Sequence, residues 1–156
     1  MKNSIKLMFI ILFIIVAIPA FTFLYYNYNS THFSCSATYT AINNQNVFLS
    51  KNSLNINGTH GTWMMDGKIT YPDAEPFFFK LRNSFRVEKV NFSYHFYSEK
   101  VSVTSNRDTY SDNLHEFLAD ILIKENVDSF FYIYPLNKDY VIFSGSMPIM
   151  YCMKSK

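Results

Sequence analysis

Residues 87–106 read VEKVNFSYHFYSEKVSVTSN, and apolar side chains alternate with polar ones along most of this stretch. Alternation with a period of two places the apolar side chains on one face of a β-strand. Ser98–Lys100 then form a turn between two expected strands, Val87–Tyr97 and Val101–Asn106, so the stretch predicts an antiparallel hairpin. The side chains expected on the apolar face of the first strand are Val90, Phe92, Tyr94 and Phe96.

Further segments with strand character lie on both sides of this hairpin. Gly61–Tyr71 fits either one strand or two short strands broken at Asp66–Gly67, and Pro72 and Pro76 bracket a loop. Strands therefore dominate the chain after residue 30. The other expected strands are Phe33–Ile42, Val47–Ile56, Phe77–Leu81, Phe130–Tyr134, Tyr140–Ser144 and Ile149–Met153.

The segment at residues 114–122 has apolar side chains at helical spacing instead of alternation. With Ser111 or Asp112 as the N-cap, it predicts an amphipathic helix of about three turns. Such a helix would act as a lid on the sheet, or its apolar face would meet a partner helix or a lipid surface. Strands, then one helix, then strands indicate an α+β domain, mostly antiparallel, with a strongly curved sheet or barrel. The apolar face of the helix consists of Leu114, Phe117, Leu118, Ile121 and Leu122.

An uninterrupted apolar run, Leu7–Tyr26, precedes the strands, with Lys2 and Lys6 before it and no further Lys or Arg until Lys51. About 20 residues at ~1.5 Å per residue span roughly 30 Å, the thickness of the hydrocarbon core of a bilayer. Positive charge stays on the cytoplasmic side, which places the following chain outside the cytoplasm. The predicted organisation is a cytoplasmic tip (1–6), a transmembrane anchor (7–26) and an exported β-rich domain (27–156).

A cleavable signal peptide is the competing interpretation of this run, because it too has a basic start and an apolar stretch. The run is longer than a signal core of ~7 to 15 residues, and Ala20 has Ile18, not a small residue, two positions before it. A cluster of tyrosines at the end of the run is typical of an interfacial aromatic belt. These features favour an uncleaved anchor.

Charge excludes direct nucleic-acid binding by the exported part. Without Lys2 and Lys6, 12 of the 14 basic residues remain, and they balance the 12 acidic residues, all of which lie beyond residue 60. Nucleic-acid binding needs a basic stripe, and this region is formally neutral. About 130 residues with no Pro- or Gly-rich linker indicate one domain.

The two cysteines, Cys35 and Cys152, lie near opposite ends of the exported part. In an oxidising compartment a disulfide between them is expected, and it would restrict the unfolded chain by roughly 4 to 5 kcal/mol. Two buried thiols are the alternative. A redox-active pair is not expected, because the chain has no Cys-x-x-Cys motif.

Catalytic and metal-binding motifs do not emerge from the sequence. No two of His32, His60, His95 and His115 have the i, i+4 or i, i+2 spacing that directs two imidazoles at one metal. Nucleophile elbows, phosphate-binding glycine loops and dinucleotide fingerprints are also missing. The sequence therefore predicts no cofactor, no metal and no enzymatic activity.

Aromatic residues make up 19% of the chain, and many lie outside the apolar run. They either build a core rich in Phe, or they line a cavity or a partner interface. Within Phe77-Phe78-Phe79, alternation directs at least one ring away from the core. The residues predicted to contact a ligand or partner are Trp63, Phe77, Phe79, Tyr94, Phe96 and Phe117.

The layout resembles the FidL-like proteins of enterobacteria and the similar MyfF and PsaF proteins of Yersinia. The resemblance is carried by the basic tip, the anchor, Cys35 soon after it, the mid-chain hairpin, Asp112-Asn113 opening a lone helix, and a terminal Pro148–Cys152, PIMYC. Members are small proteins of the bacterial inner membrane, with a cytoplasmic N-terminus and a periplasmic domain. They accompany membrane-spanning transcription regulators of the ToxR type, much as ToxS accompanies ToxR.

The resemblance implies an accessory subunit that binds and stabilises such a regulator and helps it sense a signal that controls virulence or fimbrial genes. It also implies a lipocalin-like barrel, completed with the partner, that holds a small apolar ligand such as a bile salt or fatty acid. It carries over no catalytic residue, and of the motif only Cys35 and Cys152 transfer. The alternative function is a tethered periplasmic protein that binds the apolar ligand without a partner.

Overall fold

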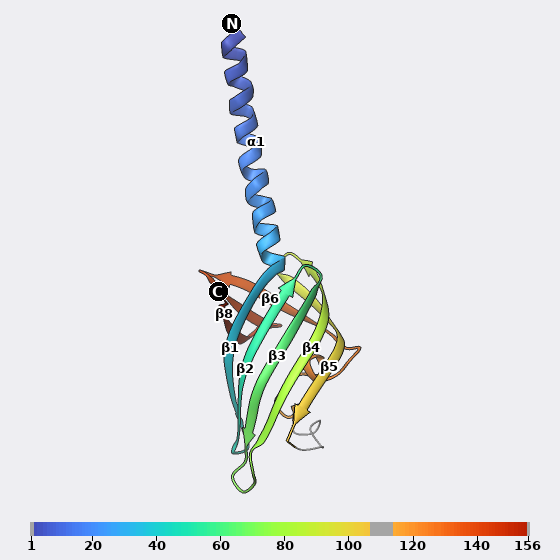
Figure 1. The fold of residues 1–156 in the computed structure, drawn as a ribbon. Helices are drawn as coiled ribbons and strands as arrows, with labels where there is room; N and C mark the ends of the chain where they lie inside the picture. The colour runs from blue at the N-terminus through green and yellow to red at the C-terminus, as the bar shows by residue number, and fades with distance from the viewer. Residues whose placement is uncertain (1, 107–113, 156) are drawn as a thin grey trace.

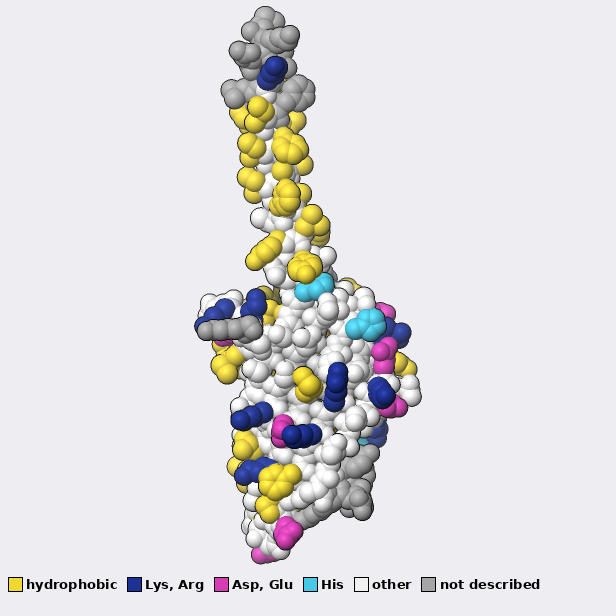
Figure 2. All heavy atoms as spheres, in the orientation of Figure 1, with side chains coloured by type: hydrophobic (Ala, Val, Ile, Leu, Met, Phe, Trp, Pro, Cys, Tyr) yellow, Lys and Arg dark blue, Asp and Glu magenta, His cyan; other side chains and the backbone are white. Residues whose placement is uncertain are grey.

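A single long helix leads into a β-barrel in the structure of this chain, a computed structural model that describes residues 2–106 and 114–155 (Figure 1). The helix, α1, spans Lys2–Thr31 without interruption at Pro19, and apolar side chains cover its visible faces in Figure 2. Its segment Ile10–Thr31 is long and apolar enough to cross a membrane, and no other helix in the described ranges is. The helix continues past the apolar run to Thr31, and in its last turn Ser30 and Thr31 donate side-chain hydrogen bonds to the carbonyl of Asn27.

Eight antiparallel strands follow in chain order and close into a barrel in which each strand pairs with its sequence neighbours and β8 pairs with β1. Every strand expected outside the 87–106 stretch is confirmed, and the third is one strand instead of two. The fold is therefore the expected α+β arrangement with a lipocalin-like barrel. The strands are β1 His32–Asn43, β2 Asn46–Asn57, β3 His60–Thr70, β4 Phe77–Val90, β5 Ser93–Ser105, β6 Asp128–Leu136, β7 Asp139–Ser144 and β8 Met147–Lys154.

The prediction of a hairpin between Val87–Tyr97 and Val101–Asn106 was wrong: residues 93–105 form one strand, β5, and the turn lies at Asn91–Phe92, between β4 and β5. Asn91 has φ +59°, a left-handed conformation that asparagine tolerates, so it supplies the tight turn. Ser98–Lys100 instead form a β-bulge, in which Glu99 has no residue opposite it on β4. The polar run bends strand β5 instead of ending it.

Because the turn lies earlier than expected, the four residues predicted to share one apolar face (Val90, Phe92, Tyr94 and Phe96) do not all lie on the same face. Tyr94 and Phe96 point into the barrel and are buried, whereas Val90 and Phe92 lie at the turn and are exposed.

The three-turn helix expected after Ser111 or Asp112 is broken in the structure. Both candidate N-caps lie outside the described residues. Leu114 and the next residue are helical, Ala119 is extended with φ −68° and ψ 149°, and a short helix, α3, spans Asp120–Ile123. The apolar face is nevertheless directed inward as expected, because Leu114, Leu118 and Ile121 are buried and Phe117 and Leu122 pack against them. Core contacts, and not helical continuity, decide the conformation of this lid.

Phenylalanine is the most frequent residue type in the core of the barrel. Phe48 stacks against Phe79 with ring centroids 5.6 Å apart, and Phe85 against Phe96 at 4.3 Å. Inward and outward residues alternate along β4, so Phe78 is 52% exposed between two buried phenylalanines, as alternation requires. The buried core thus takes up part of the aromatic content, and many of the other rings lie on α1 or on the outer face of the barrel.

The strands of the barrel differ in length, and some neighbouring strands pair over far fewer residues than others. Strands β1–β5 are 11 to 14 residues long, whereas β6–β8 have 6 to 9 residues. β5 pairs with β6 over five residue pairs and β8 with β1 over two. The expected disulfide is confirmed: Cys35 on β1 and Cys152 on β8, with Cα atoms 5.4 Å apart, form a covalent bond beside this short ladder.

Candidate functional site

The seam between β1 and β8 is joined at one end and open at the other. Cys35 and Ser36 pair with Lys154 and Met153, and beyond them no residue of β1 pairs with β8 within the described parts of the chain. From Ala37 onward, β1 therefore presents an edge that pairs with β2 alone. Exposed apolar side chains lie on both sides of this open seam: Ile42 on β1, and Met147 and Tyr151 on β8.

The backbone of β1 directs hydrogen-bonding groups into this open seam. Asn44 and Gln45 form a two-residue turn with φ +46° and +72°, the geometry of a type I′ hairpin, in which the flanking pair Asn43 and Asn46 is hydrogen-bonded. Hydrogen-bonded and non-hydrogen-bonded pairs then alternate along the β1–β2 ladder. Thr38 and Thr40 fall in non-hydrogen-bonded pairs, so their N–H and C=O groups point away from β2. Such an edge is a template for an added strand.

The end of β8 is held by Asp139 at the start of β7. Its carboxylate accepts a hydrogen bond from the Tyr151 hydroxyl at 2.7 Å and one from the backbone N–H of Lys154 at 3.0 Å. Both hydrogen bonds hold the pKa of the Asp139 carboxyl below its ordinary value, and the one from the Tyr151 hydroxyl has the larger effect. These contacts fix the joined end of the seam, and within residues 2–106 and 114–155 no strand pairs with the rest of β8 on the side away from β7.

Behind the open seam lies an internal pocket of about 210 Å³. Residues of β1, β2, β3, β6, β7 and β8 line it, and the lid at 117–122 covers it. Its polar groups satisfy each other, because Trp63 Nε1 donates to Asn52 Oδ1 at 3.2 Å and Asn52 Nδ2 donates to Ser50 Oγ at 3.0 Å. The remaining wall is mostly apolar, and its main members are Tyr39, Met65, Phe117, Leu122, Phe131, Ile149 and Met150.

The six aromatic residues predicted to contact a ligand or partner do not form one site. Trp63 and Phe117 line the internal pocket, and Tyr94 lies below the end of α1. The other three, Phe77, Phe79 and Phe96, are fully buried core residues that reach no surface.

Sequence reasoning missed most of the pocket wall, including Tyr39, Phe131 and Met150, because these residues come from strands far apart in the sequence. One signal was present for Asn52. It falls on the inward face of β2 together with Phe48 and Leu54, and a polar residue on an otherwise apolar face indicates an internal polar contact.

The end of α1 is fastened to the mouth of the barrel. The Tyr94 hydroxyl donates to the Ser30 carbonyl at 2.8 Å, and Lys89 Nζ donates to Ser30 Oγ at 2.7 Å. The Lys89 ammonium lies 5.7 Å from the ring centroid of Tyr26. Burial raises the pKa of the Tyr94 hydroxyl and lowers the pKa of Lys89. The helix therefore continues into the barrel through specific polar contacts.

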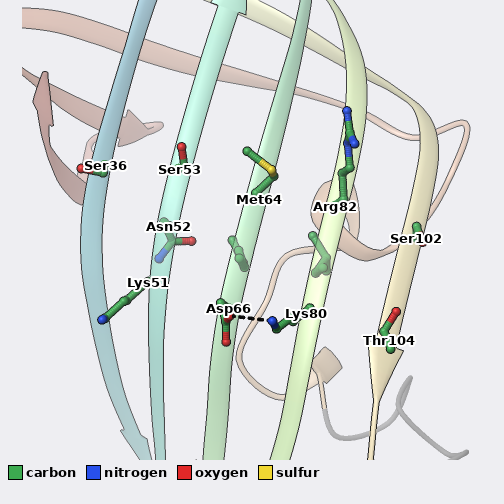
Figure 3. A pocket seen from close by; sticks show the side chains of 12 residues that line it. Ser36, Lys51, Asn52, Ser53, Met64, Asp66, Lys80, Arg82, Ser102 and Thr104 are labelled. Atoms are coloured by element: carbon green, nitrogen blue, oxygen red, sulfur yellow. Dashed lines mark ion pairs between the residues drawn. The ribbon is translucent and has the colours of Figure 1, made fainter. Parts of the chain in front are cut away.

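A shallow outer groove of about 510 Å³ crosses the outside of β1–β5 (Figure 3). The register aligns two rows of side chains, one through Lys51, Asp66 and Lys80 and one through Met64 and Arg82. Lys80 Nζ lies 3.4 Å from Asp66 Oδ2, an exposed pair worth little to stability. The groove carries three basic groups and one acidic group.

Residues 2–106 and 114–155 hold no group of three His, Cys, Asp or Glu side chains arranged to bind a metal ion. His95 Nε2 lies 2.7 Å from Asp128 Oδ2, and His115 Nδ1 lies 3.2 Å from Asp120 Oδ1. Each of these two imidazoles thus has one carboxylate beside it.

Comparison with known proteins adds no relative. No protein-family model matches the chain, and a search of curated proteins finds no significant match. The resemblance to the FidL-like proteins therefore rests on the short motifs quoted above. Fold and site together define a class: a β-barrel carried on one apolar N-terminal helix, with an open strand edge beside an internal apolar pocket.

Proposed function

We propose that this chain is a periplasmic accessory subunit, anchored in the bacterial inner membrane by α1, that binds a membrane-spanning transcription regulator of the ToxR type. It stabilises the periplasmic domain of the regulator and helps it to sense a signal that controls virulence or fimbrial genes. The orientation follows from Lys2 and Lys6, which keep the N-terminus cytoplasmic.

The observation that carries this proposal is the open edge of β1 from Ala37 to Asn43. An extended segment of a partner can add to such an edge, with main-chain hydrogen bonds supplying affinity and side-chain pockets supplying specificity. Exposed Ile42 and Met147 would gain cover in the same step. The added strand would also close the seam in front of the internal pocket, so partner binding and ligand binding would be coupled.

Co-purification tests this proposal. The full chain is co-expressed with the ToxR-type regulator of the same organism, and the complex is isolated from detergent-solubilised membranes under oxidising conditions. Thr40→Pro removes a backbone N–H that faces the open seam and is expected to abolish co-purification, whereas Thr40→Val keeps that N–H and is expected to retain it. Failure of the unaltered chain to bind the regulator would refute the proposal. Equal binding by both variants would place the interface elsewhere.

The internal pocket favours a second candidate function, the binding of a small apolar ligand. At about 210 Å³ it is smaller than the ~300 to 1,000 Å³ typical of sites for drug-sized molecules. A bile salt or a long fatty acid would therefore require the seam to widen, whereas a short acyl chain would fit with little change. A ligand would also pack directly against Trp63, the only tryptophan of the chain.

Titration of the full chain with cis-parinaric acid, read as energy transfer from Trp63, tests this second function. Ser129→Phe fills the pocket and is expected to weaken binding, whereas Ser102→Phe on the outer wall is the matched control. The absence of energy transfer at saturating probe would count against a site for a long fatty acid in this chain alone.

A further inference from the structure

The end of the barrel that carries α1 also carries exposed apolar side chains at the tips of its turns. Val90 and Phe92 lie at the β4–β5 turn, and Leu136 lies at the end of β6 on the same rim. In Figure 1 the β4–β5 turn lies beside the foot of α1. Single exposed apolar residues need no explanation, but several grouped at one end around an apolar helix mark an interaction surface.

Contacts with α1 fix the depth of this turn relative to the proposed membrane. The predicted anchor ends at Tyr26, and Asn27–Thr31 extend the helix by a further ~7.5 Å. The headgroup layer on each side of a bilayer is about 5 to 7 Å thick. Lys89 contacts both Tyr26 and Ser30, so its ammonium group lies within this layer.

Phe92 reaches the same depth. Together with Lys89 it lines a hollow of about 900 Å³ between α1 and the β4–β5 turn, and the helix side of the hollow includes Phe23 and Tyr26. Phe23 still belongs to the apolar run. A side chain that shares a hollow with Phe23 therefore lies at the boundary between headgroups and acyl chains.

We infer that the β4–β5 turn is a lipid-binding surface, in which Val90 and Phe92 enter the outer leaflet beside α1 and Lys89 lies at the level of the phospholipid phosphates. This inference rests on the proposed anchoring of α1 in a membrane. Apolar tips with a cation beside them are the features by which a protein surface enters the interfacial layer.

Charge defines the kind of lipid that this surface accepts. Glu88 also lines the hollow and offsets the charge of Lys89, so the attraction comes from apolar contact and not from net positive charge. Zwitterionic phospholipids are therefore sufficient. Insertion of the turn adds a second point of attachment to α1, which sets the orientation of the barrel and of its open seam above the membrane.

Depth-dependent fluorescence quenching tests this inference on the full chain in phosphatidylcholine nanodiscs whose lipids are brominated on the acyl chains near the headgroup. Phe92→Trp is placed in a Trp63→Phe background. Phe78→Trp in the same background is the matched control, because Phe78 is similarly exposed but lies near the other end of β4, roughly 40 Å away. If Trp63→Phe prevents folding, both substitutions are read against the unaltered chain instead.

About twofold quenching of Phe92→Trp, with little quenching of Phe78→Trp, is expected for a side chain buried ~5 to 10 Å into the interface. Equal, weak quenching of both variants in chains that have entered the nanodiscs would overturn the inference and leave the anchor in place. A chain that does not enter the nanodiscs would instead overturn the anchoring on which the inference rests.

Discussion

Reduction of the disulfide between Cys35 and Cys152 is expected to destabilise the barrel strongly. The two residues are 117 positions apart, so the bond restricts the unfolded chain by about 5 kcal/mol in the chain-entropy model. Unfolding about 125 ordered residues carries an entropy of roughly 0.26 kcal/mol/K, which converts this energy to a loss of about 15 to 20 °C in Tm. The structure adds a local effect, because among the residues that the structure describes two strand pairs join β8 to β1, Cys35–Lys154 and Ser36–Met153.

Thermal unfolding followed by circular dichroism, with and without a reductant, measures this effect. A Cys35→Ala, Cys152→Ala double variant is the control, and its Tm should not respond to the reductant. Amide hydrogen exchange should show that β8 loses protection first on reduction, because the seam opens locally before the whole barrel unfolds. Oxidised and reduced protein that melt within a few degrees of each other would refute the reasoning, since strand pairing would then hold the seam without the covalent bond.

Three further changes probe the rest of the fold. Gly61→Ala would direct a methyl group into the ring of Phe85 and is expected to lower the free energy of unfolding in urea by about 1 to 3 kcal/mol. Asn83→Ala removes the buried amide that donates to the Ile121 carbonyl at 2.6 Å, so we expect a loss of about 1 to 3 kcal/mol and faster hydrogen exchange in residues 120–123. Asp139→Asn tests the pH dependence. Because the folded pKa of Asp139 is depressed, its contribution is present above the unfolded pKa and is lost as the pH falls through the folded value. The stability difference between the parent and this variant should therefore shrink in acid, and a constant difference would contradict the assignment.

Alternation along the chain predicted most strands because the period of two is a local property. It failed at the β4–β5 hairpin, where the polar run Ser98–Lys100 indicated a turn. The decision depended on Asn91 adopting a positive φ and on Glu99 being accommodated as a bulge opposite β4. The alternation pattern shows neither the backbone conformation of Asn91 nor the bulge. A bulge is defined by how a strand pairs with its partner strand, here β4.

The lid illustrates the same limit for helices. Its 3.6-residue period correctly identified which side chains face the core, including Leu118 and Ile121. Continuity of the helix did not follow, because packing against the barrel and the hydrogen bond from Asn83 to the Ile121 carbonyl set the local backbone. Periodicity predicts burial more reliably than it predicts the unbroken length of a helix.

The sequence by itself determined the apolar helix and the antiparallel β class, and it favoured a disulfide between the two cysteines over two buried thiols. Each of these follows from composition, from local periodicity, or from the fact that two cysteines can pair in only one way. The tertiary structure alone decided that β1 and β8 diverge after Ser36, that a pocket lies behind the open seam, and that Lys89 reaches back to the end of α1. These features depend on the lengths and registers of elements that contact each other although they lie far apart in the sequence. A local sequence pattern does not specify such long-range contacts.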